Sequence, residues 1–182
     1  MKLALRCEKD LLVEKTIKIL NRHLTKRHCS EIELTAGAAD LIWSLDSSYP
    51  EEGFSIANLP DGTAEIKGGS SCALLYGVGK MLHTANFANG HFQLGPWRGF
   101  SRPESSRRII YLATHFHNYY HVAPLEDIAE YLEDLALWGY NHLMIWVDKH
   151  HFNGPDDPAL IQFVDRVKKL YVLGAEIGRA HV

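Results

Sequence analysis

The chain has 182 residues, 46% of them hydrophobic, and a formal net charge of −3 at pH 7. This length can bury one large core or two small ones, and the slight negative charge without a Lys/Arg run argues against a nucleic-acid surface. No apolar stretch approaches the roughly 20 residues of a membrane span, and residues 1–6 lack a signal-peptide pattern. We therefore expect no nucleic-acid or membrane partner and a cytoplasmic location by default.

The first half of the chain alternates helical and strand patterns. Residues 11–24 carry apolar side chains at helical spacing, which predicts an amphipathic helix. Period-two or continuously apolar segments then predict four strands, at 31–35, 41–45, 53–56 and 63–67. Pro60-Asp61-Gly62 lies between the last two strands and predicts that they form a hairpin.

A second helix is predicted after this hairpin. Ser70 or Ser71 supplies its N-cap, and its apolar face carries Leu74, Val78, Met81 and Leu82. Gly77 and Gly79 lie inside the helical pattern and follow no strand, so we interpret them as points of close helix packing and not as a phosphate loop. Residues 96–106 are polar and interrupted by Gly and Pro, which is typical of a linker.

The pattern changes beyond the linker. Residues 108–114 form a continuous apolar run, which predicts a strand buried on both faces. Pro124 at the first helical position opens a predicted helix that Gly139 stops at the C′ position, and a second buried strand covers 142–147. Asp157-Pro158 then opens a helix that Gly174 can end. Strand, helix, strand and helix in this order predict βα units and a parallel sheet.

These elements predict an α/β protein: a small α+β layer, made of a sheet with two helices, followed by the first two βα units of an incomplete TIM barrel. A closed barrel takes roughly 200 residues or more, and two units would leave an apolar sheet edge exposed. We therefore expect a truncated barrel. Residues 177–182 match the translation of a common sequencing adapter, so we interpret them as an artefact and leave them out of the fold.

Polar and aromatic side chains follow both predicted barrel strands. The carboxyl ends of barrel strands form the face where active sites lie, and aromatic rings stack on sugar rings while His and Asn bind hydroxyls. The sequence therefore predicts a carbohydrate site at this face. The residues that we expect to bind the substrate are His115, His117, Asn118, Trp146, Asp148 and His150.

Two other interpretations stay open at this point. His115-x-His117 at the end of a first barrel strand resembles the metal-dependent amidohydrolases, in which Asp148 or His150 could add ligands. A non-catalytic carbohydrate-binding module is the second alternative. No cofactor motif occurs in the sequence, so we expect no cofactor and no metal in the favoured interpretation. Cys7, Cys29 and Cys72 are interpreted as reduced thiols, because no Cys-x-x-Cys spacing is present.

Two stretches resemble a known family. The Glu52-Gly53-Phe54 strand, the strand at 63–67 and the helix with Tyr76-Gly77 near its start resemble the N-terminal accessory domain of glycoside hydrolase family 20, the β-hexosaminidases. Related domains precede the barrels of α-glucuronidases. Trp138-Gly139-Tyr140-Asn141 resembles the turn that leads into the second barrel strand of that family. His115 stands where the family has a sugar-binding Arg, which indicates a different sugar.

The resemblance implies a domain order and an activity. Residues 1–95 would be the accessory domain, 96–106 a linker and 107–176 the first two βα units of a catalytic (β/α)8 barrel. The whole protein would be a glycosidase that cleaves glycosidic bonds in oligo- or polysaccharides. The catalytic carboxylates of the family lie on later strands, so we expect this fragment to be inactive by itself.

Overall fold

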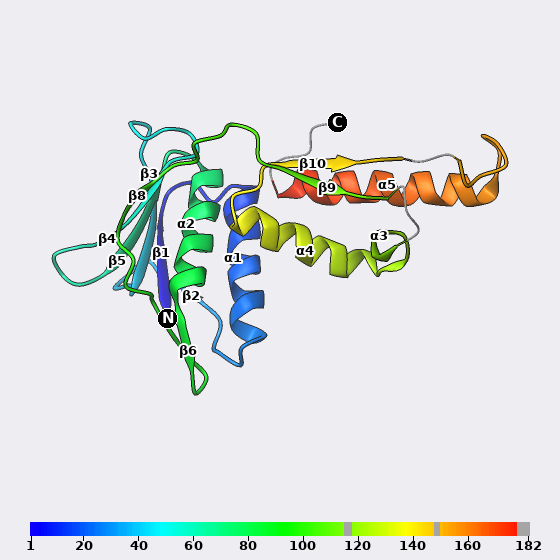
Figure 1. The fold of residues 1–182 in the computed structure, drawn as a ribbon. Coiled ribbons are helices and arrows are strands. Elements are labelled where there is room, and N and C mark those ends of the chain that lie inside the picture. The colour runs from blue at the N-terminus through cyan, green and yellow to red at the C-terminus, as the bar shows by residue number, and fades with distance from the viewer. Residues whose placement is uncertain (115–117, 148–149, 178–182) are drawn as a thin grey trace. The chain divides into compact units, whose positions relative to one another are not determined.

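The computed structural model describes residues 1–114, 118–147 and 150–177. The chain divides into two compact units (Figure 1). The first unit comprises residues 1–104 together with 137–139, and the second comprises the described residues of 105–136 and 140–182. The described part is a mixed α/β fold with a six-stranded mixed sheet and five helices, and this part contains no closed barrel.

The first unit is built on the six-stranded sheet, whose strand order is β2-β1-β3-β5-β4-β8. Strands β2, β1, β3 and β5 run parallel, and β4 runs antiparallel to both β5 and β8. The strands are β1 (Lys2–Arg6), β2 (Glu33–Leu34), β3 (Leu41–Leu45), β4 (Phe54–Asn58), β5 (Ala64–Gly68) and β8 (Gly99–Ser101). A separate hairpin pairs β6 (Asn86–Ala88) with β7 (His91–Gln93).

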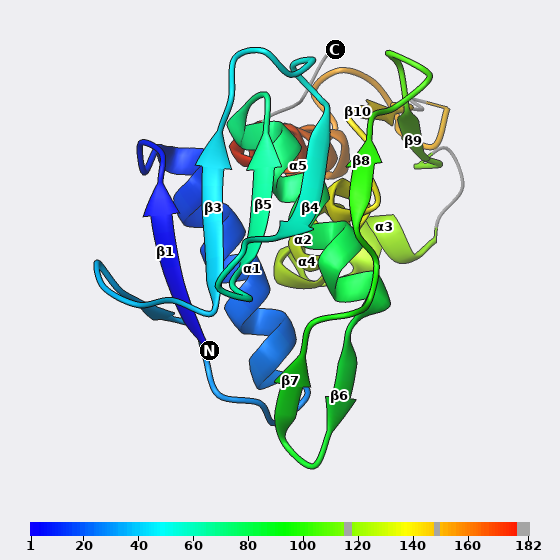
Figure 2. The same cartoon turned by 90° about the vertical axis from the view of Figure 1, so that its left-hand side faces the viewer.

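Two helices cover one face of this sheet, α1 (Leu11–Thr25) and α2 (Ser71–Thr84) (Figure 2). Asp10 caps α1 by accepting a hydrogen bond from the Val13 N–H, and Ser70 caps α2 by accepting one from the Ala73 N–H. Each cap satisfies a backbone donor that the helix itself leaves unpaired. Both predicted helices and the hairpin of β4 and β5 are therefore confirmed.

Apolar side chains between this face and the helices form the core of the first unit. Trp43 and Ile66 face each other across β3 and β5 and are fully buried, as is Leu74 of α2. Gly77 lies directly over the sheet, because a Cβ atom at this position would stand 2.4 Å from the Cγ2 of Ile66. The interpretation of Gly77 as a point of close packing is confirmed.

Several strands of the first unit differ from the prediction. β1 was not predicted, the expected strand at 31–35 shrinks to Glu33–Leu34, and β8 lies inside the expected linker. The β6–β7 hairpin was also missed, although its Asn89-Gly90 turn has the positive φ angles, 53° and 75°, that such turns require. β1, β2 and β8 have two to five residues and are defined by hydrogen bonds to strands that lie far away in the sequence, not by a pattern of their own.

The second unit contains two parallel strands and three helices. β9 and β10 pair in register from Ile109↔His142 to Leu112↔Ile145. The elements are β9 (Ile109–Leu112), α3 (Tyr119–Val122), α4 (Leu125–Leu137), β10 (His142–Ile145) and α5 (Pro158–Glu176). Asp157 caps α5 and Pro158 opens it, as the sequence predicts. The βα units and the parallel pairing are confirmed, while α3 was not predicted.

Two expectations for the second unit are wrong. Gly174 does not end α5, which continues to Glu176, and Gly174 is buried inside it. The strand at 109–112 is not buried on both faces, since Ile109 and Tyr111 are 43% and 42% exposed while Leu112 is fully buried. Among the described residues, helices cover one side of this sheet only, and β-strand side chains alternate between the two sides.

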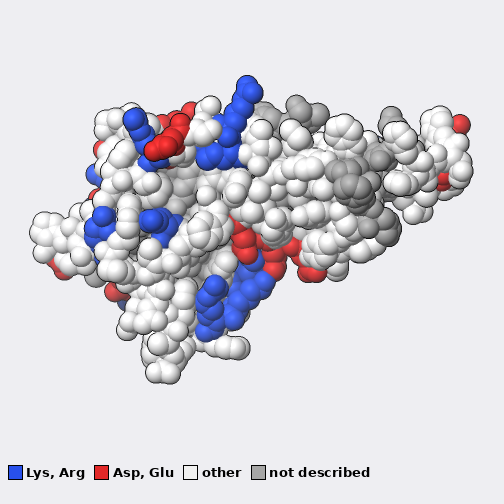
Figure 3. Space-filling model, in the orientation of Figure 1, with Lys and Arg blue, Asp and Glu red and all other residues white. Residues whose placement is uncertain are grey.

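Charged side chains follow the amphipathic pattern of the surface helices. On the face drawn in Figure 3, Lys and Arg side chains lie over α1, opposite its buried stripe. Lys9 pairs with Glu14 at 3.2 Å, and both side chains are solvent-exposed. No helix in the described part of the chain is both long and apolar enough to cross a membrane.

We expect Gly77→Ala to lower the free energy of unfolding of the first unit by about 1–2 kcal/mol. Alanine favours a helix by about 1 kcal/mol over glycine, but overpacking of a filled core typically costs about 1–3 kcal/mol. Hydrogen exchange of the β5 and α2 amides measures the effect. The control is Gly77→Ala combined with Ile66→Leu, which removes the clashing Cγ2 and should recover part of the loss. An unchanged or raised stability of Gly77→Ala would contradict the packing.

Candidate functional site

The carboxyl ends of β9 and β10 lie side by side, because Leu112 and Ile145 are paired in register. The chain continues from them as Ala113-Thr114 and as Trp146-Val147. The Thr114 hydroxyl donates a hydrogen bond to the backbone carbonyl of Trp146. This bond joins the two segments that follow the strands, and it brings Trp146 next to the end of β9.

Asn118 organises the segment that follows β9. Its side-chain Nδ2 donates to the Ala113 carbonyl at 2.7 Å, and its Oδ1 accepts from the Tyr120 N–H at 3.1 Å. Its backbone N–H donates to His121 Nδ1 at 3.3 Å, which completes a capping box at the start of α3. The amide of Asn118 thus positions the backbone at the strand end.

Arg166 of α5 holds the same segment from the other side. Its Nε donates to the Tyr120 carbonyl at 2.8 Å, and its Nη2 donates to the Ala123 carbonyl. The His121 ring also stacks on Phe163 of α5, with ring centroids 5.0 Å apart. Because a guanidinium presents several donors in a rigid fork, one side chain satisfies both carbonyls near the end of α3.

One side of the two-stranded sheet presents large side chains to solvent. Trp146 is 57% exposed, and Met144, two residues earlier on the same side, is 49% exposed. Tyr111 is the register partner of Met144 and lies on this side too. An exposed indole can stack on the apolar face of a ring.

The segment between β10 and α5 is fixed at its second end. His150 is exposed, and the Phe152 ring stacks on Phe163 at 5.9 Å. Asp157 accepts hydrogen bonds from the backbone N–H groups of Asn153 and Ala159, both at 2.9 Å. These bonds, the one from Asn153 above all, hold the pKa of Asp157 below its usual value. The carboxylate that caps α5 therefore stays ionised at neutral pH.

Of the expected site residues, Asn118 and Trp146 lie at the carboxyl ends of β9 and β10, and His150 is exposed in the loop that follows β10. His115, His117 and Asp148 lie outside the described residues, and the metal interpretation rests on them. Within the described ranges, no group of three His, Cys, Asp or Glu could hold a metal ion. Sequence reasoning missed Arg166, because its contacts to Tyr120 and Ala123 leave no local signal. It also missed Tyr111 and Met144, which the period-two rule and the strand register together would have found.

The amino ends of the two strands are fixed by one buried side chain, Asn141, which is 2% exposed. Its Oδ1 accepts from the Arg108 N–H at 2.9 Å, and its Nδ2 donates to the Ser106 carbonyl at 2.9 Å. Its backbone N–H donates to the Arg108 carbonyl at 3.0 Å. Asn141 therefore defines the register from which the position of the carboxyl ends follows.

The fold resembles the N-terminal portions of several solved glycoside hydrolases. The family 20 exo-β-N-acetylglucosaminidase of Vibrio harveyi, solved with N-acetylglucosamine, matches with a TM-score of 0.70 at 11% identity, over 98% of this chain and 31% of that one. A family 138 enzyme that targets pectin rhamnogalacturonan II matches with a TM-score of 0.65 at 13% identity, over 98% and 24%. A family 115 4-O-methyl-α-glucuronidase with specificity for decorated arabinogalactans matches with a TM-score of 0.59 at 14% identity, over 79% of this chain and 25% of that one.

These matches confirm the predicted resemblance at the level of the fold. This chain spans about 31% or less of the length of the three enzymes. No family profile matches the sequence, and no curated protein matches it.

We expect Asn141→Leu to lower the free energy of unfolding of the second unit by about 2–4 kcal/mol, since each buried backbone group left without its partner costs about 1–3 kcal/mol. Exchange of the β9 and β10 amides reports the loss. Asn153→Ala is the matched control, because its side-chain amide donates to Asp157 at the exposed start of α5, and it should change stability by less than about 1 kcal/mol. Equal effects of the two variants would refute the role of Asn141.

We expect Arg166→Met to speed amide exchange in residues 118–123 by at least about tenfold while leaving β9 and β10 unchanged. The methionine keeps an apolar stem but removes two charge-assisted hydrogen bonds, each contributing about 1.5–3 kcal/mol. Lys168→Met on the same helix is the control, since its ion pair with Asp165 is exposed and contributes little. Protection that survives in Arg166→Met would show that the segment is held by other contacts.

Proposed function

We propose that this chain is the N-terminal part of a glycoside hydrolase. In this proposal residues 1–95 are an accessory domain, 96–106 a linker, and 107–176 the first two βα units of a catalytic (β/α)8 barrel, with 177–182 outside the native sequence. The observation that carries the proposal is the fold match that runs through both units and covers 98% of the chain at a TM-score of 0.70.

The open side of the second unit supports the barrel assignment. β9 and β10 pair in parallel, helices cover one side of them, and the other side presents Tyr111 and Met144. In a closed barrel that second side faces the interior, which side chains fill in layers. A hollow of about 610 Å³ also runs along β10, lined in part by His142, Met144 and Tyr171. It offers space for a further strand beside β10.

The sugar subsite of the proposed enzyme lies at the carboxyl ends of β9 and β10. Trp146 would stack on the sugar ring, while Asn118 and Arg166 would hold the surrounding backbone in place. His115, His117, Asp148 and His150 would add hydrogen bonds to hydroxyls. The general acid and its partner would come from later strands, as the family 20 resemblance implies, with hydrolysis proceeding through two carboxylates or one carboxylate assisted by a substrate amide.

Extending the reading frame past Glu176 in the source DNA tests the proposal. We expect the extended protein to hydrolyse at least one member of an aryl-glycoside panel, and the 182-residue chain to hydrolyse none. In the extended protein, Trp146→Ala should lower kcat/KM at least tenfold, about 1.4 kcal/mol, through loss of ring stacking.

Trp138→Ala is the matched control, because Trp138 is also largely exposed and lies outside the proposed subsite. It should leave kcat/KM within about twofold of wild type, well under 1 kcal/mol. Turnover by the 182-residue chain, or an extended protein that cleaves no glycoside, would refute the proposed function.

A further inference from the structure

The six-stranded sheet of the first unit has one face that carries polar and aromatic side chains. The sheet has helices on one face, and in Figure 2 its other face is turned to the viewer with no described helix of this unit over it. Side chains at matched register positions form one row across five strands of this open face. The row consists of Phe100 (β8), Ser55 (β4), Lys67 (β5), Ser44 (β3) and Arg6 (β1).

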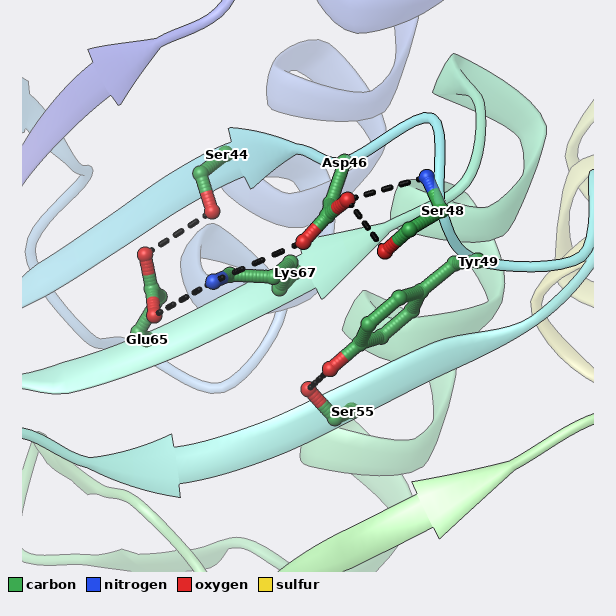
Figure 4. A network of polar contacts seen from close by, with 7 residues as sticks. All are labelled: Ser44, Asp46, Ser48, Tyr49, Ser55, Glu65 and Lys67. Atoms are coloured by element: carbon green, nitrogen blue, oxygen red, sulfur yellow. Dashed lines mark hydrogen bonds and ion pairs between the residues drawn. The ribbon is translucent and has the colours of Figure 1, made fainter.

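The centre of the row is a connected polar network (Figure 4). Ser44 donates to Glu65 Oε1 at 2.8 Å, and Lys67 Nζ lies 3.9 Å from Glu65 Oε2 and 4.0 Å from Asp46 Oδ2. The Ser48 hydroxyl and N–H donate to Asp46 Oδ1 at 2.6 and 2.9 Å. The ion pairs join the Lys67 ammonium to both carboxylates, and the hydrogen bonds join each carboxylate to a serine.

Hydrogen bonds in this network favour the ionised form of Asp46, and the side chains around the network are closely packed. The hydrogen bonds from Ser48, the hydroxyl first, hold the pKa of Asp46 below its usual value. Ile42, Ser44 and Glu65 are at most 9% exposed although no described helix of the first unit covers them. Neighbouring side chains therefore fill this face closely and support the half-buried Lys67 and Asp46, so a ligand that binds these two groups pays less entropy to order them.

An aromatic pair closes the β8 end of the row. Phe100 is 51% exposed, and its ring packs edge-on against Tyr49 with centroids 5.5 Å apart. The Tyr49 hydroxyl lies 3.1 Å from Ser55 Oγ, and Gly53 gives the Phe100 ring its room, because a Cβ there would stand 3.1 Å from Phe100 Cζ. One flat apolar ring thus adjoins a line of fixed hydroxyl, ammonium and carboxylate groups.

We propose that this open face binds a neutral oligosaccharide. A pyranose ring offers an apolar face for Phe100. Its adjacent hydroxyls can donate to the Asp46 carboxylate and accept from the Lys67 ammonium, whose side chains are 35% and 32% exposed. Asp46 and Glu65 balance Lys67 and Arg6 in charge, so the face attracts neither polyanions nor polycations. The row spans four strand spacings of about 4.8 Å, or about 19 Å, which accommodates a short glycan.

This site is distinct from the proposed subsite at the ends of β9 and β10, and it goes beyond the proposed function. It requires no catalytic group and no later part of the barrel. Its chemistry would hold a polysaccharide chain through contacts that carry no hydrolytic step.

Titration of the 182-residue chain with cellohexaose, chitohexaose and polygalacturonate tests the proposal, with binding followed by calorimetry and by amide chemical shifts. We expect at least one neutral hexasaccharide to bind with a Kd on the order of 0.1–1 mM and to shift the amides of β4, β5 and β8. Phe100→Ala and Phe100→Leu should each weaken this binding at least fivefold. The leucine variant keeps apolar contact with the packed loop but removes the flat ring, so it separates binding from folding.

Matched controls distinguish this site from other sugar contacts. Lys67→Met should weaken binding, whereas Lys168→Met and Phe92→Ala on the β6–β7 hairpin should not. Trp146→Ala should leave binding unchanged. If Trp146→Ala abolishes binding and Phe100→Leu does not, the proposal is overturned while the subsite of the proposed hydrolase gains support. The proposal is also overturned if neither neutral hexasaccharide binds at a concentration about tenfold above the expected Kd. Stronger binding of polygalacturonate than of either neutral sugar overturns it as well.

Discussion

The buried amide of Asn141 is the contact on which the geometry of the second unit depends. It binds the backbone of Ser106 and Arg108 and so fixes how β10 lies along β9. Register in a sheet decides which side every following residue faces, and a slip by one position would exchange the two sides. Asn141 sets this register just before β10 begins. The register in turn places Trp146, which follows β10, beside Thr114, which follows β9. A polar group at one end of the strand pair thus positions an aromatic ring at the other.

Both units share one structural constraint, which is that helices cover one side of each sheet among the described residues. In the first unit the open side is polar and internally bonded, as Ser44, Glu65 and Lys67 show. In the second unit the open side carries Ile109, Tyr111 and Met144, which are large and apolar. A polar open face is stable in water, whereas an apolar one is favoured only when another layer covers it. The polar face of the first sheet is thus compatible with the proposed glycan surface, and the apolar face of the second with the proposed barrel interior.

Local signals predicted the helices well, and non-local pairing explains most of what was missed. Asp10, Ser70 and Asp157-Pro158 mark helix starts through bonds made within three residues, so the sequence displays them directly. β8 is defined by its pairing with β4, more than 40 residues earlier, and a three-residue strand has no periodicity of its own. The same limit applies to the site. The positions of Asn118 and Trp146 after their strands were predictable, whereas the clamp by Arg166 depends on a helix that folds back from 46 residues away.

The matched enzymes bear on how a specific sugar is selected. Enzymes of families 20, 138 and 115 share this N-terminal fold at 11–14% identity to the chain, so the packing of helices on strands is compatible with different glycans. Side chains that the core does not constrain lie mostly in the segments after the strands, and these segments can change while the fold is kept. In this chain the segment after β10 carries the exposed Trp146, and Asn118 and Arg166 bind the backbone of the segment after β9. These contacts order the backbone after β9 and leave the Trp146 side chain exposed at the neighbouring strand end.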